Sequence, residues 1–244
     1  AALRVEDASV VNMATSLVDL GGSEVVDILI EKLRDPNPNN RLYALYALGK
    51  IPDQRVVRPL VETLRDEQIG WLAAKALANI GQPAIPGLLE SLFVEDATVR
   101  RYATSALGEI RSPKATRGMV RMLQDQDNGV VDAAAVALVN IDDRTVIPEV
   151  ARLLSSPRAR VRQRSLDVLG RLGDESVAES VASCIADPDR EVVKAAIAAL
   201  GNLKAAASCP LIARMLAIPG QDLQDTLRMA FLNIGPPAVG CLEG

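Results

Sequence analysis

Arginine side chains gather in one segment of this 244-residue sequence and suggest anion binding. Residues 144–172 contain seven arginines and two acidic residues, so the segment carries a net charge of +5 and the rest of the chain carries −9. Arg160, Arg164 and Arg171 fall on the side of a predicted helix that faces away from the core, or on the rim of that side. Because guanidinium groups bind carboxylates and phosphates, we expect these three residues to contact an acidic partner segment or another anionic ligand. The alternative is a solvated, arginine-rich face, and Arg162 is expected to form a structural ion pair.

Aromatic side chains form a second candidate site, because four of the six in the chain, at positions 43, 46, 71 and 102, fall on three successive predicted helices of the same kind. The helical phase predicts that Tyr46 and Trp71 point away from the core, with Leu42 beside them, and that the other two lie on the flank. Exposed Tyr and Trp offer rigid contact area for a partner. The alternative is that the flank tyrosines pack between repeats and only Trp71 is exposed. The predicted partner-binding residues of this region are Leu42, Tyr43, Tyr46, Trp71, Arg101 and Tyr102.

Other chemistries find less support in the composition. The chain has no histidine, which removes the commonest general base and neutral metal ligand, and we predict neither a metal site nor a cofactor. Cys184, Cys209 and Cys241 form no close-spaced pair, so buried thiols in a reducing compartment are expected. Asp132, Asp167 and Asp225 are candidate acid–base groups, but surface carboxylates are normally just solvated. The sequence therefore predicts no catalytic residue.

A helical repeat must position these side chains. Eight segments align at spacings of 29 to 31 residues, and each carries a large apolar residue at its second position. These positions are Leu17, Leu48, Leu77, Leu107, Leu138, Leu169, Leu200 and Phe231. A second apolar series ends at Leu33, Leu64, Leu92, Leu123, Leu154, Ile185 and Leu216. Each repeat is thus predicted to be a pair of helices, of which the second carries the aligned segment.

Small residues and helix-capping residues recur at fixed places in the repeat. Alanine occupies two core positions of most second helices, as at Ala103 and Ala106, where it lets neighbouring helices approach closely. Aspartates precede second helices and are predicted N-caps: Asp66, Asp96, Asp127 and Asp189. Prolines fall in the first turns of first helices: Pro59, Pro86 and Pro148. Asparagines share one register and either bind a peptide backbone or satisfy helix C-terminal carbonyls: Asn79, Asn140, Asn202 and Asn233.

The repeat resembles the HEAT-repeat family, in the short form named after phycobilisome lyases. The motif D-x-x-V-R-x-x-A-x-x-A-L-G-x-I is met by Asp96, Val99, Arg100, Ala103, Ala106, Leu107, Gly108 and Ile110. The resemblance covers essentially the whole chain and implies that second helices line a concave face. We therefore predict an all-α fold, a right-handed α-solenoid of about eight helix pairs forming a single domain over residues 1–244. Because both ends match partial repeats, at residues 3–7 and 236–244, we expect a longer array.

A shorter stretch, RLYALYALGK at residues 41–50, also resembles the R-Y-Y-A-A-W-W-L-G-K motif of E/F-type bilin lyase subunits. Six positions match: Arg41, Tyr43, Ala44, Leu48, Gly49 and Lys50. Tyr46 stands where that family has tryptophan, while Leu42, Leu45 and Ala47 depart from the motif. This resemblance implies an alternative function as a bilin lyase or tetrapyrrole-chaperone subunit acting on an open-chain tetrapyrrole. Aromatic side chains would then cover the rings, and arginines would hold the propionates.

The leading expectation is a non-catalytic, cytoplasmic scaffold that binds another protein or a peptide segment. No apolar run approaches the roughly 20 residues of a membrane span. The net charge of −4 argues against non-specific nucleic-acid binding, which needs a basic surface. A DNA-binding protein of the helical-repeat glycosylase type is supported only by the arginine cluster. Metal-dependent HEAT hydroxylases use His-Glu pairs, which this histidine-free chain cannot form.

Overall fold

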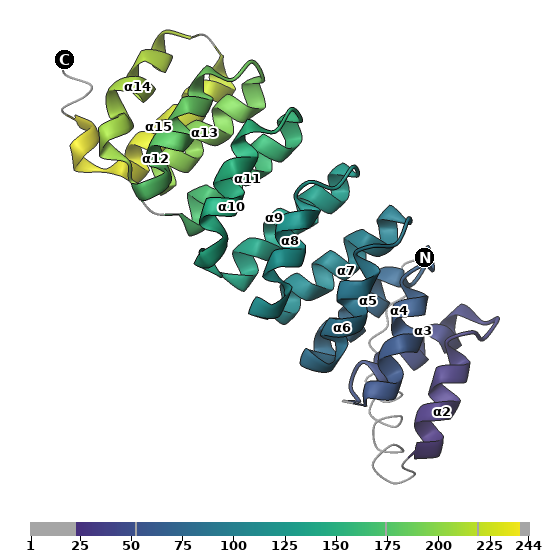
Figure 1. Ribbon diagram of the computed structural model, residues 1–244. Coiled ribbons are helices and arrows are strands. Elements are labelled where there is room, and N and C mark those ends of the chain that lie inside the picture. Colours follow the sequence, from purple (N-terminus) through teal and green to yellow (C-terminus); the bar gives the residue numbers. More distant parts are fainter. Residues whose placement is uncertain (1–22, 52, 174, 219, 240–244) are drawn as a thin grey trace. The chain divides into compact units, whose positions relative to one another are not determined.

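The chain forms helices throughout the part described by the computed structural model, which covers residues 23–51, 53–173, 175–218 and 220–239 (Figure 1). No strand occurs among these residues. Contacts divide the chain into two compact units, Ala1–Ala115 and Thr116–Gly244. The prediction of an all-α fold of helix pairs is confirmed within each unit. The predicted repeat around Leu17 and the thiol of Cys241 lie outside the described residues.

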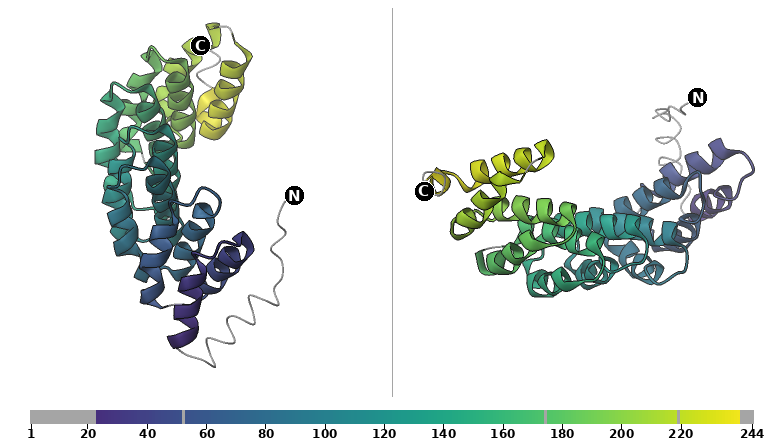
Figure 2. Two further views of the ribbon diagram at one scale, coloured as in Figure 1. Left: turned by 90° about the vertical axis from the view of Figure 1, so that its right-hand side faces the viewer. Right: turned by 90° about the horizontal axis from the view of Figure 1, so that it is seen from above.

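Unit 1 contains three described helix pairs, which follow one another in chain order (Figures 1 and 2). The first helices are α2 (Ser23–Lys32), α4 (Val57–Thr63) and α6 (Ile85–Ser91). The second helices are α3 (Pro38–Leu48), α5 (Gly70–Ile80) and α7 (Ala97–Ile110). Each second helix packs against the first helix of its own pair, and α5 also packs against α3 and α7.

Unit 2 contains four successive helix pairs, and α9, α11 and α13 each pack against the first helix of their own pair. The first helices are α8 (Thr116–Met122), α10 (Ile147–Arg152), α12 (Ala178–Ser183) and α14 (Cys209–Arg214). The second helices are α9 (Asn128–Ile141), α11 (Ala159–Leu172), α13 (Arg190–Asn202) and α15 (Gln221–Ile234). Contacts join α9 to α11, α11 to α13 and α13 to α15, so the second helices form one continuous layer of this unit.

Short 3-10 turns lead into or follow the first helices. Those that lead in are Gln54–Val56, Gln82–Ala84, Pro113–Ala115, Arg144–Val146, Glu175–Val177 and Ala206–Ser208. Those that follow are Leu153–Ser155, Cys184–Ala186 and Met215–Ala217, and Pro236–Ala238 comes after α15. Pro86 and Pro148 lie at the first or second position of α6 and α10, and Pro59 is the third residue of α4, as predicted. A missing backbone N–H costs little there because the first turn leaves these groups without a helical partner.

Aspartate side chains begin the second helices as the sequence predicts. Asp96 accepts hydrogen bonds from the backbone N–H groups of Thr98 at 2.8 Å and Val99 at 3.4 Å, and Asp127 and Asp189 do the same for α9 and α13. Asp66 accepts from two N–H groups just before α5. These contacts satisfy N–H groups that the first turn cannot pair within the helix. They fix where α7, α9 and α13 start.

The core of each unit is aliphatic, with alanine where second helices meet. The predicted alanine positions are at most 5% exposed: Ala44, Ala47, Ala73, Ala76, Ala103, Ala106, Ala134, Ala137, Ala196 and Ala199. Leucines fill the space between the helix layers, and Leu48, Leu77 and Leu107 are completely buried. Because most of the core side chains are small or aliphatic, the few aromatic residues are not needed to fill it.

Glycine sets how closely two pairs of second helices approach in unit 2. A Cβ atom on Gly170 would lie 2.8 Å from Cα of Ala199, and one on Gly201 would lie 2.7 Å from Cα of Ala230. Carbon atoms in ordinary contact are about 3.5–4.0 Å apart, so a side chain at either position would push the helices apart. The same register of α9 carries Val139 instead of glycine. This difference affects the groove described below.

Three further findings concern membrane-spanning helices, metal-binding clusters and the cysteine thiols. No helix of the described residues is both long and apolar enough to cross a bilayer. Within the same residues, His, Cys, Asp and Glu side chains form no cluster that could hold a metal ion. Cys184 and Cys209 are buried and form no disulfide with each other, and burial raises the pKa of the Cys184 thiol. Their environment is that of core thiols rather than of reactive nucleophiles.

Candidate partner-binding grooves

A groove of about 290 Å³ opens between α3 and α5 in unit 1, and we call it the aromatic groove. Its polar and aromatic lining residues are Tyr46, Lys50, Trp71, Lys75 and Asn79. Its apolar lining consists of Leu45, Gly49, Leu72 and Ala76. The indole of Trp71 is 52% exposed, and the Tyr46 side chain is half-buried. The prediction that Trp71 points away from the core is therefore confirmed.

Two lysines add positive charge to the aromatic groove. Lys50 and Lys75 are exposed, and neither ammonium group forms an ion pair or a hydrogen bond with a described residue. The groove therefore combines an exposed indole, a phenol and two free ammonium groups over an apolar floor. Such a lining suits an anionic group attached to an apolar or flat body. The position of both lysines beside Tyr46 could have been predicted from the sequence. Lys75 occupies the repeat position of Tyr46 in the next helix pair, and Lys50 follows Tyr46 by one helical turn.

Leu42 was predicted beside the exposed aromatics, and this prediction is wrong. Its side chain is only 6% exposed and belongs to the core. Thr104 and Gly108 of α7 are also buried, although both lie outside the stripe formed by Val99, Ala103 and Ala106. The physical reason is that a second helix contacts both the first helix of its pair and the neighbouring second helices. It therefore buries a wider arc than its alanine stripe alone indicates.

The flank tyrosines do not join the aromatic groove. Tyr43 and Tyr102 are both half-buried. A Cβ atom on Gly70 would lie 3.1 Å from Cε2 of Tyr102, so the Tyr102 ring packs against the start of α5 in the preceding pair. The Arg101 guanidinium lies 5.3 Å from the centre of the same ring, a cation–π contact. The four aromatics thus do not form one patch, and the aromatic surface reduces to Trp71 and Tyr46.

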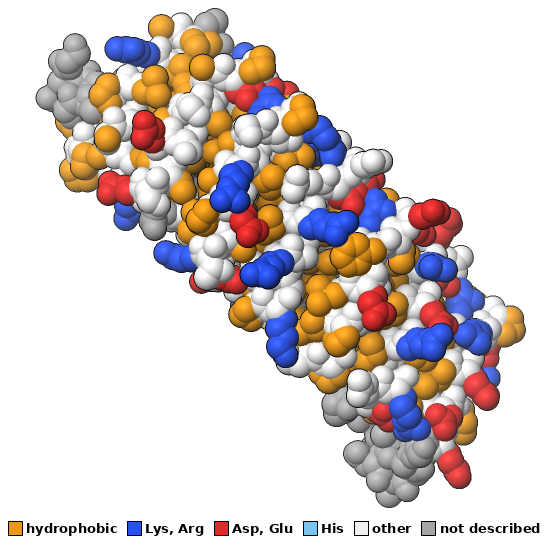
Figure 3. All heavy atoms as spheres, viewed as in Figure 1, with side chains coloured by type: hydrophobic (Ala, Val, Ile, Leu, Met, Phe, Trp, Pro, Cys, Tyr) orange, Lys and Arg blue, Asp and Glu red, His pale blue; other side chains and the backbone are white. Residues whose placement is uncertain are grey.

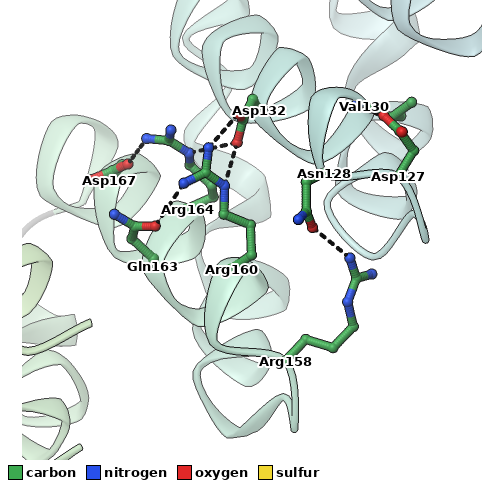
Figure 4. A network of polar contacts seen from close by, with 9 residues as sticks. All are labelled: Asp127, Asn128, Val130, Asp132, Arg158, Arg160, Gln163, Arg164 and Asp167. Carbon is green, nitrogen blue, oxygen red and sulfur yellow. Dashed lines mark hydrogen bonds and ion pairs between the residues drawn. The ribbon is translucent and has the colours of Figure 1, made fainter. Parts of the chain in front are cut away.

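The arginine-rich segment forms an ion-pair network on the second helices of unit 2 (Figure 4). Asp132 of α9 accepts hydrogen bonds from Arg160 Nε and Arg164 Nε, both at 2.8 Å, and also pairs with Arg160 Nη2. Arg164 Nη1 donates to Asp167 Oδ2 at 2.7 Å, and Arg160 Nη1 donates to Gln163 at 3.1 Å. The network therefore joins α9 to α11. Arg160 and Arg164, predicted to face an acidic partner, already have acidic neighbours within the chain.

Charge pairing also fixes the protonation of Asp132. Burial acts to raise its pKa, but hydrogen bonds from Arg160 and Arg164 outweigh this and hold the pKa below its usual range. The carboxylate is therefore ionised near neutral pH and cannot serve as a general acid there. Asp167 is tied to Arg164, and Asp225 accepts a hydrogen bond from Gln221 at 3.3 Å. Each of the three candidate acid–base side chains therefore already has a hydrogen-bond partner within the chain.

Two other arginines of the segment hold the repeats together. Arg158 stands where other second helices have a capping aspartate, and its side chain makes no cap. Instead it donates to the backbone oxygen of Asp125 and, at 3.1 Å, to that of Gln126. It also donates to Asn128 Oδ1 at 2.9 Å (Figure 4). Arg162 forms two 2.7 Å hydrogen bonds to Asp187. The expectation of a structural ion pair for Arg162 is confirmed.

A second groove, of about 460 Å³, runs over α9, α11 and α13, and we call it the arginine groove. Its polar lining residues are Asp132, Asn140, Arg164, Asp167, Arg171 and Asn202. Its apolar lining includes Ala135, Val136, Val139, Ala195 and Ala198. Arg171 is exposed and has no ion pair with a described residue, so it is the cation of this groove that remains available. Arg160 lies in the network but does not line the groove.

The asparagine register makes no cap at the helix ends. Among the described residues, the side-chain amides of Asn79, Asn140, Asn202 and Asn233 form no hydrogen bond to a backbone carbonyl. The contact that does occur joins two helices, since Asn233 Nδ2 donates to Asn202 Oδ1 at 3.1 Å. The alternative in which these residues satisfy helix C-terminal carbonyls is therefore wrong.

The helix pairs and the grooves on their second helices define a helical-repeat protein. A family model for HEAT repeats matches residues 11–77, 26–97, 85–164 and 147–230. The chain therefore belongs to the HEAT-repeat family, as the motif at residues 96–110 indicates.

Similar proteins include a cyanobacterial relative and solved structures. The chain is 29% identical over 122 residues to the uncharacterized phycocyanin operon protein Z of Pseudanabaena tenuis (strain PCC 7409), an alignment covering 46% of this chain. The chain spans 60% of the length of that relative. A chain of the CpcE–CpcF complex of phycocyanin lyase from Nostoc sp. PCC7120 is 21% identical to this chain, with a TM-score of 0.45. The match covers 89% of this chain and 92% of that one. Human deoxyhypusine hydroxylase is 19% identical, with a TM-score of 0.42 and coverage of 91% and 88%. At these identities the likeness of the structures concerns the fold alone.

Proposed function

We propose that this chain is a non-catalytic scaffold that binds another protein through the aromatic groove of unit 1. The observation that carries the proposal is the 52% exposed indole of Trp71 at the edge of a groove that also contains Tyr46. Tryptophan and tyrosine dominate binding energies when a partner covers them in a pocket. The unpaired ammonium groups of Lys50 and Lys75 select a partner segment that carries acidic residues near an apolar anchor.

The remainder of the chain supports a scaffold rather than an enzyme. Asp132 and Asp167 are occupied by arginines, and Cys184 is a buried thiol whose pKa is raised. On the face seen in Figure 3, acidic and basic side chains are interspersed among apolar ones and gather into no large patch of one sign among the described residues. A mixed surface of this kind favours a specific partner over non-specific binding to nucleic acid.

The experiment that tests the proposal is quantitative affinity capture with the intact protein, followed by mass spectrometry. Wild type is compared with Trp71→Ala and with Phe93→Ala, whose ring is 61% exposed and lies outside the groove. We expect a retained protein that is lost with Trp71→Ala and kept with Phe93→Ala. If every retained protein binds all three forms equally, the aromatic groove is not the partner site.

A second candidate function is that of a bilin lyase or tetrapyrrole-chaperone subunit. The match of residues 41–50 to the E/F-type motif favours it, together with the similarity to a phycocyanin operon protein. In this alternative Trp71 and Tyr46 would cover the rings. The propionates would pair with Lys50 and Lys75, which line the same groove, rather than with arginines of unit 2.

An absorbance titration separates the two functions. Biliverdin is added to the intact protein and to Trp71→Ala, and the visible spectrum is recorded. A saturable spectral change that Trp71→Ala abolishes would favour the pigment-binding function. An unchanged spectrum would exclude it and leave the protein-binding function standing.

A further inference from the structure

We propose that the arginine groove of unit 2 binds an extended peptide segment that carries an acidic side chain between aliphatic ones. Arg171 would hold the carboxylate, and Asn140 and Asn202 would bind the peptide backbone. The proposal rests on the scaffold function in that the peptide belongs to a protein partner. It does not depend on the aromatic groove, which lies in the other unit.

The charge arrangement of the groove is the first argument. Asp132 and Asp167 are neutralised by Arg160 and Arg164, which reach them at hydrogen-bonding distance. Arg171 is exposed in the same lining and has no acidic partner among the described residues. The network therefore leaves one positive charge in excess. A guanidinium with its donors free matches a single carboxylate in bidentate geometry.

The asparagines on either side of Arg171 are the second argument. Asn140, Arg171 and Asn202 are separated by 31 residues each and occupy equivalent positions of α9, α11 and α13. Asn202 Oδ1 already accepts a hydrogen bond from Asn233, so the amide of Asn202 is left to donate. An asparagine side chain offers both a donor and an acceptor, as a peptide group does. A row in which two asparagines flank an arginine fits a peptide that crosses the helices.

The spacing of the helices gives the length of the ligand. Packed helices lie about 8–10 Å apart, and an extended chain rises about 3.3 Å per residue, so one helix spacing corresponds to about three residues. A segment reaching from Asn140 to Asn202 crosses two spacings and is therefore about six residues long. Its middle residue would lie over Arg171. This places the acidic side chain at the centre of the segment.

The apolar lining selects the neighbours of that acidic residue. Val136 is 61% exposed, and Ala198 occupies its register on α13. Covering Val136 with an aliphatic side chain would remove apolar surface from water. Val139 adds to this apolar lining, at the register that glycine occupies in α11 and α13.

The test uses a blocked hexapeptide, Ala-Leu-Glu-Leu-Ala-Ala, and its counterpart with glutamine in place of glutamate. Each is titrated into the ¹⁵N-labelled full chain, and amide shifts give the site and the dissociation constant. We expect shifts in α9, α11 and α13, with the glutamate peptide binding about tenfold more tightly, a factor equal to about 1.4 kcal/mol. Arg171→Gln should abolish this preference, whereas Asn140→Ala should weaken both peptides equally. Arg152→Gln, an exposed arginine outside the groove, is the matched control and should change nothing.

Three outcomes would overturn the proposal. One is shifts confined to unit 1, a second is a glutamate preference that survives in Arg171→Gln, and a third is tighter binding of a single-stranded hexanucleotide through Arg171. The Trp71→Ala variant is titrated in parallel. If it loses its protein partner but binds the hexapeptide normally, the two grooves act separately. If it loses its protein partner and the hexapeptide fails to bind wild type, only the present proposal is lost.

Discussion

The guanidinium of Arg162 lies against the carboxylate of Asp187, with Nε–Oδ2 and Nη2–Oδ1 distances of 2.7 Å each. The side chains are only 12% and 8% exposed. Arg162 belongs to α11, whereas Asp187 lies in the loop before α13 and also accepts a hydrogen bond from the backbone N–H of Asp189. The pair therefore joins two successive repeats at the place where the later second helix begins.

This ion pair predicts how stability depends on pH. Hydrogen bonds from Arg162 lower the pKa of Asp187 against the opposing effect of burial. Its stabilising contribution is therefore complete above the unfolded-state pKa of about 3.9 and is lost as the pH falls through the lower folded-state value. We expect Asp187→Asn to reduce the free energy of unfolding by about 2–3 kcal/mol at pH 7. Urea denaturation at pH 7, 5, 4 and 3 checks this, and a difference that does not shrink below pH 4 would contradict it.

Substitution of Asp132 is expected to reduce stability less than substitution of Asp187. Asp132→Asn removes the charge that pairs with both Arg160 and Arg164, whose side chains are about one-third exposed. We expect a loss of about 1–2 kcal/mol, between the values for surface and buried pairs. Asp167→Asn is the control, because Asp167 pairs with Arg164 alone and should cost less. Equal losses for both substitutions in urea denaturation would show that Asp132 does not hold the network together.

Substitution of Gly170 tests the effect of widening the contact between α11 and α13. In Gly170→Ala the new methyl group would meet the backbone of Ala199 at 2.8 Å, so α11 and α13 must separate. Overpacking of this kind typically costs about 1–3 kcal/mol, and the damage should stay in the neighbouring repeats. Hydrogen exchange should therefore accelerate in α11 and α13 and remain unchanged in α3 and α5. Uniform acceleration across both units would contradict nearest-neighbour stacking.

The sequence was sufficient to predict the helices but not the surface they present. The repeat spacing and the capping residues Asp96 and Asp127 predict where second helices begin, because both act within a few residues of the chain. The exposure of Leu42 and Thr104 depends on which neighbours cover a helix, and one helix's periodicity does not contain that information. Their burial therefore appears only once the pairs are packed.

The arginine segment shows the same limit for charged side chains. The excess of arginine over residues 144–172 is evident in the sequence, yet Arg160 and Arg164 turn towards Asp132 on the neighbouring helix. Such a contact depends on helix spacing and on the conformation of long side chains. It leaves Arg171 as the available cation of the groove, a distinction that composition cannot make.

Trp71 decides the central claim that the aromatic groove binds the partner. Its side chain is half-exposed, so Trp71→Ala should leave the melting temperature nearly unchanged. Burying a large aromatic side chain contributes about 1.5–3 kcal/mol, and we expect the variant to weaken partner binding by about 2 kcal/mol or more. Phe93→Ala, at an exposed aromatic outside the groove, should weaken it by less than about 0.5 kcal/mol.

The most direct measurement is therefore a calorimetric titration of the captured partner into wild type and into Trp71→Ala. The melting temperature of each of the two forms is measured in parallel. The account predicts a dissociation constant at least about 30-fold higher for the variant, at an unchanged melting temperature. A variant that melts several degrees lower while its folded fraction binds normally would contradict it, and would make Trp71 a packing residue.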